Sequence, residues 1–303
     1  MTGGAERLAP APGFRSVEAA TEALARVGYL AEPSTAMVVY LAGRLGKPVL
    51  VEGPAGTGKT ELAKAAASAL GVRLVRLQCY EGLDEAKVLY EWNYRKQLLR
   101  IQVATQAGGT GPSDWSELEE DIFAEEFLLA RPVLEAIRSS EPVVLLVDEV
   151  DRVEVETEAL LLEALSELQV SIPELGTVRA RQVPLVFLTS NDTRELSEAL
   201  KRRCLYLHLD YPSVARERAI VLAKVPGIAE HLADEVARLV ASLRALDLRK
   251  HPSISETLDW ARALVLLGAD HADAPTTRAT LNLLLKYESD IEAAEKELAS
   301  TGW

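Results

Sequence analysis

One short stretch of the sequence has the residue types of a phosphate-binding loop. The segment VEGPAGTGKTELA, residues 51–63, places an apolar strand before a glycine-rich turn and good helix formers after it. Its glycines, lysine and threonine fit the pattern G-x-x-x-x-G-K-T, in which backbone N–H groups at a helix start close around phosphate oxygens. The residues that we expect to bind a nucleotide here are Gly53, Pro54, Ala55, Gly56, Thr57, Gly58, Lys59, Thr60 and Glu61.

Two adjacent carboxylates follow a wholly apolar run in VVLLVDEVDR, residues 143–152. Ligands of open α/β sheets bind at the carboxyl ends of the strands. We therefore expect Asp148 and the Thr60 hydroxyl to hold a magnesium ion, directly or through water. Glu149 is the better candidate for orienting and deprotonating a water molecule. The alternative is that the Asp-Glu pair only begins a surface turn.

A second apolar run, in LVFLTSND at residues 185–192, ends in a polar cluster. If both runs are strands of one parallel sheet, Asn191 lies at the same sheet edge as the carboxylates. Its amide could hydrogen-bond the γ-phosphate or align the attacking water, which would place it among the catalytic residues. Taken alone, Thr-Ser-Asn before an acidic residue is also an ordinary helix cap.

The elements that position these side chains alternate between strands and helices up to about residue 212. Continuous apolar runs separated by helices are typical of a parallel sheet covered on both faces. The expected strands are residues 48–52, 72–77, 142–147, 185–189 and 205–209, and the expected helices are 16–25, 34–44, 120–139 and 154–168. A hairpin is expected between residues 170–172 and 177–179.

After Pro212 only helical spacing of apolar residues appears, over residues 214–224, 231–246, 253–267 and 276–299. We therefore predict an α/β class fold, with a parallel sheet between helices, followed by a smaller all-helical domain. The predicted divisions are a flexible leader of residues 1–15, a nucleotide-binding core of residues 16–212 and a helical lid domain of residues 213–303.

The composition of the whole chain narrows the classes of partner. Its 303 residues carry a net charge of −13, and such a field repels nucleic acid phosphates and anionic membranes. DNA or RNA as the main partner is therefore disfavoured, because binding to nucleic acid depends on Lys and Arg. No apolar run approaches the length that spans a bilayer, and Cys79 and Cys204 lie far apart. We expect a soluble cytoplasmic protein with two reduced thiols.

The order of the motifs resembles that of the AAA+ ATPases. The phosphate loop, the carboxylate pair and the strand ending in Asn191 precede two arginines in EALKRRCLYLHL, residues 198–209, and then a helical domain. In that superfamily an arginine here reaches the nucleotide of the neighbouring subunit. The resemblance makes Arg203 the first candidate for this catalytic residue and Arg202 the second. Their alternative role is as plain surface charges.

A closer resemblance is to the MoxR branch of the AAA+ proteins. It rests on the predicted hairpin before the Asn191 strand and on the long connection over residues 80–121, which could hold an insertion in the second helix. The resemblance covers roughly residues 27–303 and is strongest over residues 48–212. Within the branch, LQCYEGLD at residues 77–84 and HPSISETLDWARAL at 251–264 look most like CoxD-type ATPases of carbon monoxide dehydrogenase maturation.

These resemblances imply a function, cofactors and partners. They imply a remodelling chaperone that hydrolyses ATP with Mg²⁺, assembles into a hexameric ring, and acts with a von Willebrand factor A-domain protein on a metalloenzyme client. One departure concerns the lid, where the turn HPSISE at residues 251–256 has no arginine at the usual place. Arg249 or Arg262 could sense the γ-phosphate instead, Arg249 being the preferred nucleotide-binding candidate, or both could be surface charges. A slow ATPase that acts as a nucleotide-gated scaffold is the alternative function, and a nucleic-acid motor is disfavoured by charge.

Overall fold

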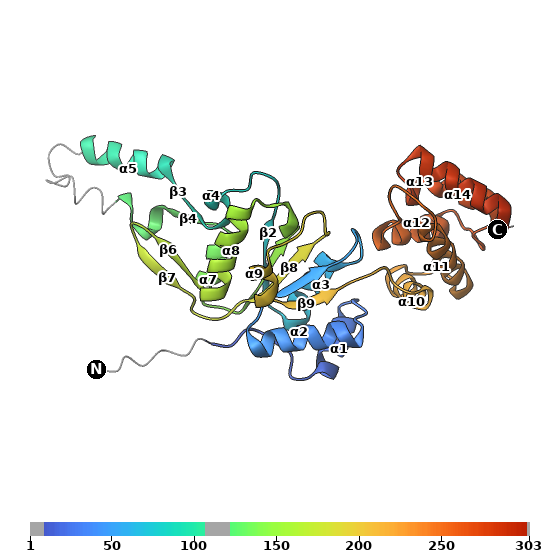
Figure 1. Ribbon diagram of the computed structural model, residues 1–303, viewed down its shortest axis with the longest axis horizontal. Helices are drawn as coiled ribbons and strands as arrows, with labels where there is room; N and C mark the ends of the chain where they lie inside the picture. The colour runs from blue at the N-terminus through green and yellow to red at the C-terminus, as the bar shows by residue number, and fades with distance from the viewer. Residues whose placement is uncertain (1–8, 107–121, 302–303) are drawn as a thin grey trace. The chain divides into compact units, whose positions relative to one another are not determined.

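The computed structural model describes residues 9–106 and 122–301 (Figure 1). The chain divides into two compact units. One comprises Met1–Glu52 and Thr60–Leu207, and the other comprises Gly53–Lys59 and His208–Trp303. The loop residues thus group with the C-terminal helices, while the strand before them and the helical residues from Thr60 onward belong to the first unit. The boundary predicted at residue 212 stays a prediction.

A five-stranded sheet in the order β2-β5-β8-β1-β9 forms the centre of the first unit. Its strands are β1 (Val49–Glu52), β2 (Arg73–Gln78), β5 (Val143–Asp148), β8 (Leu185–Ser190) and β9 (Leu205–His208). The pairs β2–β5, β5–β8 and β1–β8 are parallel. All residues of β1, β5 and β8 are buried, which explains their unbroken apolar runs. The α/β fold with a parallel sheet is thereby confirmed.

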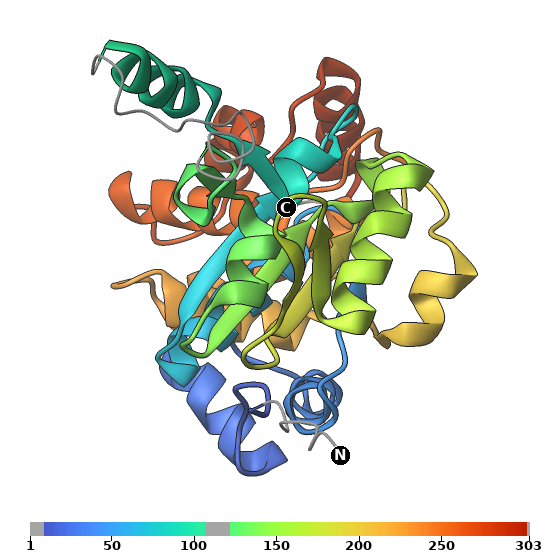
Figure 2. The same ribbon diagram turned by 90° about the vertical axis from the view of Figure 1, so that its left-hand side faces the viewer.

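Helices of the first unit alternate with the strands of this sheet along the chain. They are α1 (Val17–Arg26), α2 (Pro33–Leu45), α3 (Lys59–Leu70), α7 (Pro132–Arg138), α8 (Val155–Glu167) and α9 (Glu198–Arg203). α7 contacts β2 and β5, whereas α2 contacts β1 and β8. α1 and α2 pack against each other and lie side by side in both views (Figures 1 and 2).

The long connection between β2 and α7 contains an insertion. It comprises α4 (Glu85–Val88), β3 (Tyr90–Trp92), α5 (Tyr94–Gln106), the short helix η1 (Glu125–Phe127) and β4 (Leu128–Ala130), with β3 and β4 antiparallel. The helix expected over residues 120–139 is wrong for its described part. Pro132 is at the first position of α7, and a proline holds the preceding residue extended, so the chain enters α7 from a strand. Most of the acidic stretch at 114–126 lies outside the described residues.

A hairpin of β6 (Gln169–Ile172) and β7 (Gly176–Arg179) follows α8, as the sequence predicts. Leu168, the residue at the carboxyl end of α8, has a left-handed backbone (φ 50°) that turns the chain into the hairpin. The hairpin leads directly into β8. In the sequence, the hairpin therefore comes between β5 and β8, the two strands that end in the polar clusters.

The C-terminal unit is helical beyond its loop residues. Its helices are α10 (Val214–Lys224), α11 (Glu230–Arg244), α12 (Ile254–Leu266), α13 (Ala274–Leu284) and α14 (Glu288–Thr301). They surround a separate core centred on the fully buried Trp260. The single helix expected over residues 276–299 is wrong, because Leu285 adopts an extended backbone and separates α13 from α14. In the described part of the chain, no helix is both long and apolar enough to cross a membrane.

Candidate functional site

The phosphate-loop motif connects β1 to α3, as its pattern predicts. Gly53 (φ 146°) and Gly56 (φ 78°) have backbone conformations that L side chains rarely adopt. Space is also restricted, because a Cβ atom at Gly53 would lie 2.0 Å from the Leu209 carbonyl oxygen and one at Gly56 would lie 2.1 Å from Ser253 Cβ. Only glycine fits at either position, so the loop backbone passes close to residues of its own unit.

Lys59 folds back over this loop. Its Nζ donates to the carbonyl oxygens of Gly53 at 2.7 Å and Pro54 at 2.6 Å, and the residue is buried. The Thr57 hydroxyl donates to the Pro54 oxygen at 3.0 Å. The ammonium group is therefore held at the loop that would surround a phosphate group. Glu61 points outward on α3 and lies 3.9 Å from Lys64.

Asp148 is the most heavily hydrogen-bonded of the predicted site residues. Its Oδ1 accepts from the Thr60 hydroxyl at 2.8 Å and from the Thr189 hydroxyl at 2.6 Å. Its Oδ2 accepts from Arg76 Nη2 at 2.6 Å. The structure thus brings together the first turn of α3 and the carboxyl end of β5, two segments that are 88 residues apart.

The oxygen ligands at Thr60 and Asp148 suit magnesium, which is commonly bound through one or two carboxylates together with substrate phosphates. Among the described residues, no group of three or more His, Cys, Asp and Glu side chains could hold a metal alone. The residues present therefore fit an ion that binds jointly with a nucleotide. Thr60 and Asp148 would hold it, and bound phosphates would complete its ligands.

Glu149 follows in a strained conformation. Its backbone is left-handed (φ 59°, ψ 50°), and its N–H donates to the Thr189 hydroxyl at 2.9 Å. Its carboxylate forms an ion pair with Arg152 Nε at 3.1 Å. A non-glycine residue with positive φ persists only where the surrounding structure imposes it, and such residues cluster at functional sites.

Asn191 comes directly after β8 and is held through its backbone. The buried carboxylate of Asp151 accepts from the Asn191 N–H at 3.2 Å, the Thr193 N–H at 3.0 Å and the Thr193 hydroxyl at 2.6 Å. Between them, Asp192 has a left-handed backbone (φ 59°). Asp151 therefore fixes the turn that carries Asn191, a role that its acidic side chain in VDEVDR does not reveal by itself.

The remaining predicted site residues are three arginines, two on α9 of the first unit and one in the helical unit. Arg202 and Arg203 are exposed on the last turn of α9, where Arg202 lies 3.7 Å from Glu198 and Arg203 donates to the Ala199 oxygen at 3.3 Å. Arg249 instead stacks over the Tyr287 ring at 4.3 Å within the helical unit. Arg262, on α12, pairs with Asp259 at 2.9 Å.

Cys79 lies beside the carboxylates but is not a nucleophile. Burial, together with the nearby charges of Asp148, Asp151 and Glu149, raises the pKa of its thiol to about 12. The thiol is therefore protonated at neutral pH, and thiolate chemistry is excluded here. Its backbone N–H donates to the Asp148 carbonyl oxygen at 2.8 Å, which ties the end of β2 to the end of β5.

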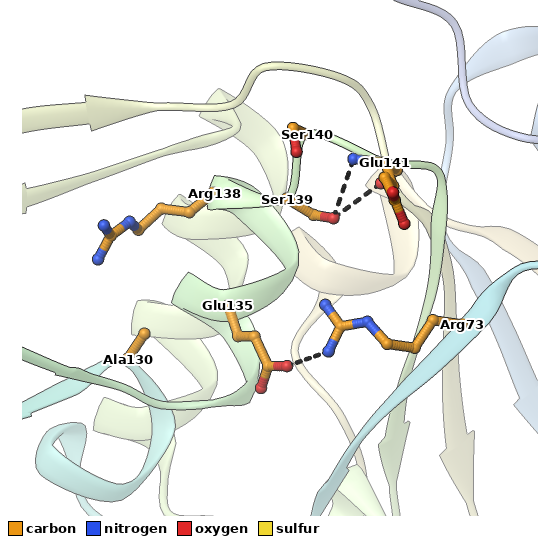
Figure 3. A pocket seen from close by; sticks show the side chains of 7 residues that line it. All are labelled: Arg73, Ala130, Glu135, Arg138, Ser139, Ser140 and Glu141. Carbon is orange, nitrogen blue, oxygen red and sulfur yellow. Dashed lines mark hydrogen bonds and ion pairs between the residues drawn. The ribbon is translucent and has the colours of Figure 1, made fainter.

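One open cavity lies at the opposite end of β2. The cavity has a volume of about 430 Å³. Figure 3 shows the side chains that line it, which include Arg73, Glu135, Arg138 and Glu141. Arg73 and Glu135 form an ion pair across it. Arg138 pairs with Glu125. Of these charged side chains, Arg73 and Glu135 thus neutralise each other, and none of the predicted site residues lines the cavity.

Comparisons with known proteins place the chain in a family. The AAA domain family (dynein-related subfamily) matches residues 48–204, just over half of the chain. No curated protein sequence gives a significant match. The solved structure of the Thermotoga maritima RuvB Holliday junction branch migration motor has a TM-score of 0.46 and 19% identity, and the alignment covers 88% of this chain and 67% of that one.

Domain III of the Thermotoga maritima replication initiation protein DnaA gives a TM-score of 0.48 at 14% identity, covering 86% of this chain and 96% of that one. AAA+ domains are in general nucleotide-hydrolysing ATPases that bind ATP and typically Mg²⁺. The family match contains the phosphate loop, Asp148, Glu149, Asn191 and Arg203. The chain therefore belongs to the AAA domain family, in its dynein-related subfamily.

Proposed function

We propose that this chain hydrolyses ATP with Mg²⁺ at the interfaces of a ring of identical subunits. The observation that carries the proposal is the hydrogen bond between the Thr60 hydroxyl and Asp148 Oδ1 (2.8 Å). It places the last residue of the phosphate-loop motif against the carboxylate at the end of β5. In phosphate-loop enzymes these two groups position the metal ion beside the phosphates.

Each predicted residue has a separate role in this proposal. Lys59 transfers its ammonium from the loop carbonyls to the β- and γ-phosphates, because phosphate oxygens carry more negative charge than carbonyls. Mg²⁺, when bound, neutralises charge that develops on the phosphates. Glu149 activates the attacking water, and its carboxylate must leave Arg152 to do so. Asn191 aligns the water by hydrogen bonding, from the turn that Asp151 holds.

The arginines on α9 support the ring. Arg203 and Arg202 are exposed, and their present partners are an Ala199 carbonyl oxygen and a distant Glu198 carboxylate. Such weakly held guanidinium groups are available to a neighbouring subunit. An arginine supplied in trans can raise the rate of hydrolysis by about 10³ to 10⁵. We assign this role to Arg203, with Arg202 as the second candidate.

A subunit-mixing experiment tests the proposal. The variants Glu149→Gln and Arg203→Ala are each expected to lose ATP hydrolysis when assayed alone. Mixed in equal amounts, a Glu149 of one variant meets an Arg203 of the other at about one interface in four, so about a quarter of the parental rate returns. Size-exclusion chromatography with multi-angle light scattering checks that the two variants co-assemble. Parental activity in Arg203→Ala, or a mixture that co-assembles without recovery, would reject the arginine assignment.

We further propose that the ring is hexameric and acts in the cytoplasm as a MoxR-type remodelling chaperone in metalloenzyme maturation. The β6–β7 hairpin before β8 and the insertion between β2 and α7 support the MoxR resemblance. A von Willebrand factor A-domain protein is the proposed partner. An ATPase rate that rises when partner and client protein are both added would favour this role, and one stimulated only by DNA would oppose it.

Arg249 stays a proposed nucleotide-binding residue. Its guanidinium must leave the Tyr287 ring for this role, whereas its backbone N–H is held by Asp290 Oδ1 at 3.0 Å. An unchanged affinity for ATP and ADP in Arg249→Ala would remove Arg249 from the site and leave the hydrolysis proposal intact.

A further inference from the structure

Arg76 on β2 forms an ion pair with Asp148. Its Nη2 lies 2.6 Å from Asp148 Oδ2, and the same nitrogen also donates to Gln78 Oε1. The Asp148 side chain is only 4% exposed, whereas that of Arg76 is 46% exposed. The guanidinium therefore reaches from the solvent side onto a buried carboxylate.

A buried carboxylate requires such a partner. Removing an ionised carboxyl group from water is costly unless an opposite charge or several hydrogen bonds compensate for the lost hydration. The hydroxyls of Thr60 and Thr189 supply hydrogen bonds to Oδ1, but neither carries a charge. Arg76 supplies a positive charge at Oδ2.

Magnesium would supply the same charge. A divalent cation held by Thr60 and Asp148 would lie close to the guanidinium, and like charges near one another repel. The cation also needs a carboxylate lone pair, and each Asp148 oxygen already accepts hydrogen bonds. Arg76 and Mg²⁺ therefore compete for the Asp148 carboxylate. Because Arg76 is half exposed and already contacts Gln78, it can leave Asp148 without becoming buried and unpaired elsewhere.

We propose that Arg76 is an internal competitor of Mg²⁺ at Asp148, a positioning residue that sets the magnesium concentration at which the site loads. This inference rests on the proposed function, because it takes Thr60 and Asp148 as the magnesium ligands. It predicts that removing the guanidinium lowers the Mg²⁺ requirement. A residue that only oriented Asp148 for the metal would have the opposite effect.

The test measures the binding of a fluorescent ADP analogue over a series of Mg²⁺ concentrations, with no hydrolysis involved. For Arg76→Gln we expect the Mg²⁺ concentration at half-maximal binding to fall about 5-fold, the size expected for losing one partly exposed ion pair. The matched control is Arg73→Gln. Arg73 lies on the same strand and pairs with Glu135 at the cavity of Figure 3. Its replacement therefore removes one positive charge from β2 without removing a partner of Asp148. Its Mg²⁺ requirement should match that of the parent.

A second readout uses thermal unfolding without nucleotide. In EDTA, Arg76→Gln should melt below the parent because Asp148 has lost its charged partner, and Arg73→Gln should melt close to the parent. If Arg76→Gln does not fold, the Mg²⁺ requirement of Arg76→Lys tests the competition instead. Lysine keeps the positive charge but is a point charge without the planar fork of arginine, so its Mg²⁺ requirement should fall about 2-fold.

The outcomes separate the two proposals. An equal or higher Mg²⁺ requirement in the Arg76 variants overturns the competition, while Mg²⁺-dependent binding by the parent leaves the proposed function standing. Binding of the analogue by the parent that shows no dependence on Mg²⁺ would instead reject Thr60 and Asp148 as magnesium ligands. A fall of equal size in Arg73→Gln would assign the effect to general charge and overturn the specific role of Arg76.

Discussion

The hydroxyl of Thr189 connects both carboxylate residues of the candidate site. It donates to Asp148 Oδ1 at 2.6 Å and accepts from the Glu149 N–H at 2.9 Å. Thr189 lies on β8, which pairs with β5 in parallel register up to Val147 and Leu188. One side chain from the neighbouring strand therefore orients the Asp148 carboxylate and supports the left-handed backbone of Glu149.

Replacing Thr189 with valine should impair both stability and hydrolysis. Valine has nearly the same shape but leaves the Glu149 N–H and one lone pair of the buried Asp148 without this partner. We expect a loss of about 1–3 kcal/mol in the free energy of unfolding, the usual cost of an unsatisfied buried group. We also expect kcat to fall about 10-fold or more, because misplaced catalytic groups lose their alignment with substrate. Urea unfolding and steady-state ATPase assays measure the two effects.

Thr157→Val is the matched control for Thr189. The Thr157 hydroxyl is also buried and donates to the Leu83 carbonyl oxygen at 2.8 Å, on a helix that carries none of the predicted site residues. This variant should lose stability but keep its kcat. If both variants lose the same fraction of kcat, the effect of Thr189 on hydrolysis is a consequence of instability alone.

The sequence predicts the ends of the strands well because apolar runs and polar clusters change there abruptly. Val143–Val147 and Leu185–Leu188 are buried on both faces of the sheet, so every residue in them is apolar and their boundaries are clear. The phosphate-loop pattern likewise depends on residues adjacent in sequence. Thr60 and Asp148 are predicted as partners from their motifs, and they lie within hydrogen-bonding distance.

The side chains that support the site could not be predicted in this way. Arg76, Asp151 and Thr189 act across strands, and their partners depend on the order β2-β5-β8-β1, which the sequence does not encode locally. The helix expected over residues 120–139 is wrong for a related reason. Phe127 has helical spacing with Leu134, but Phe127 and Leu128 pack into the core from a short turn and a strand.

Arg244 is a second side chain whose role depends on tertiary structure. On α11 its side chain is only 7% exposed and forms a two-pronged ion pair with the fully buried Glu217 of α10. Its Nε donates to the Pro252 oxygen at 2.8 Å, and its guanidinium lies over the Tyr211 ring. Arg244 thus joins α10, α11 and the turn before α12.

Arg244→Ala should destabilise the helical unit by about 3–5 kcal/mol, because Glu217 is left as an uncompensated buried charge. Arg238→Ala provides the comparison on the same helix. Arg238 pairs with Asp234 at the surface, and such i,i+4 pairs contribute about 0.3–0.5 kcal/mol. Circular dichroism during urea unfolding measures both variants. Equal losses in the two would mean that the Glu217 contact contributes no more than a surface pair.

The environment of Glu158 on α8 leads us to expect that the stability of the protein depends on pH. Its buried carboxylate accepts from Arg194 Nη2 at 2.8 Å and from the Ser197 N–H at 2.9 Å. Burial alone raises the pKa of Glu158, but the hydrogen bonds from Ser197 and Arg194 outweigh burial and hold that pKa below its ordinary value. Ser197 is the N-cap residue of α9, so this carboxylate also fixes the start of the helix that carries Arg202 and Arg203.

A group whose pKa is lower in the folded state stabilises the fold above its unfolded pKa, which is about 4.3 for glutamate. This contribution is lost as the pH falls through the lower, folded pKa. Glu158→Gln should therefore cost about 1–3 kcal/mol near pH 7, and its free energy of unfolding should approach that of the parent towards about pH 3. Glu163→Gln, at an exposed position of the same helix, should differ little from the parent at any pH. A difference between parent and Glu158→Gln that stays constant from neutral to acidic pH would show that the carboxylate charge contributes nothing, and that Glu158 anchors α9 by hydrogen bonding alone.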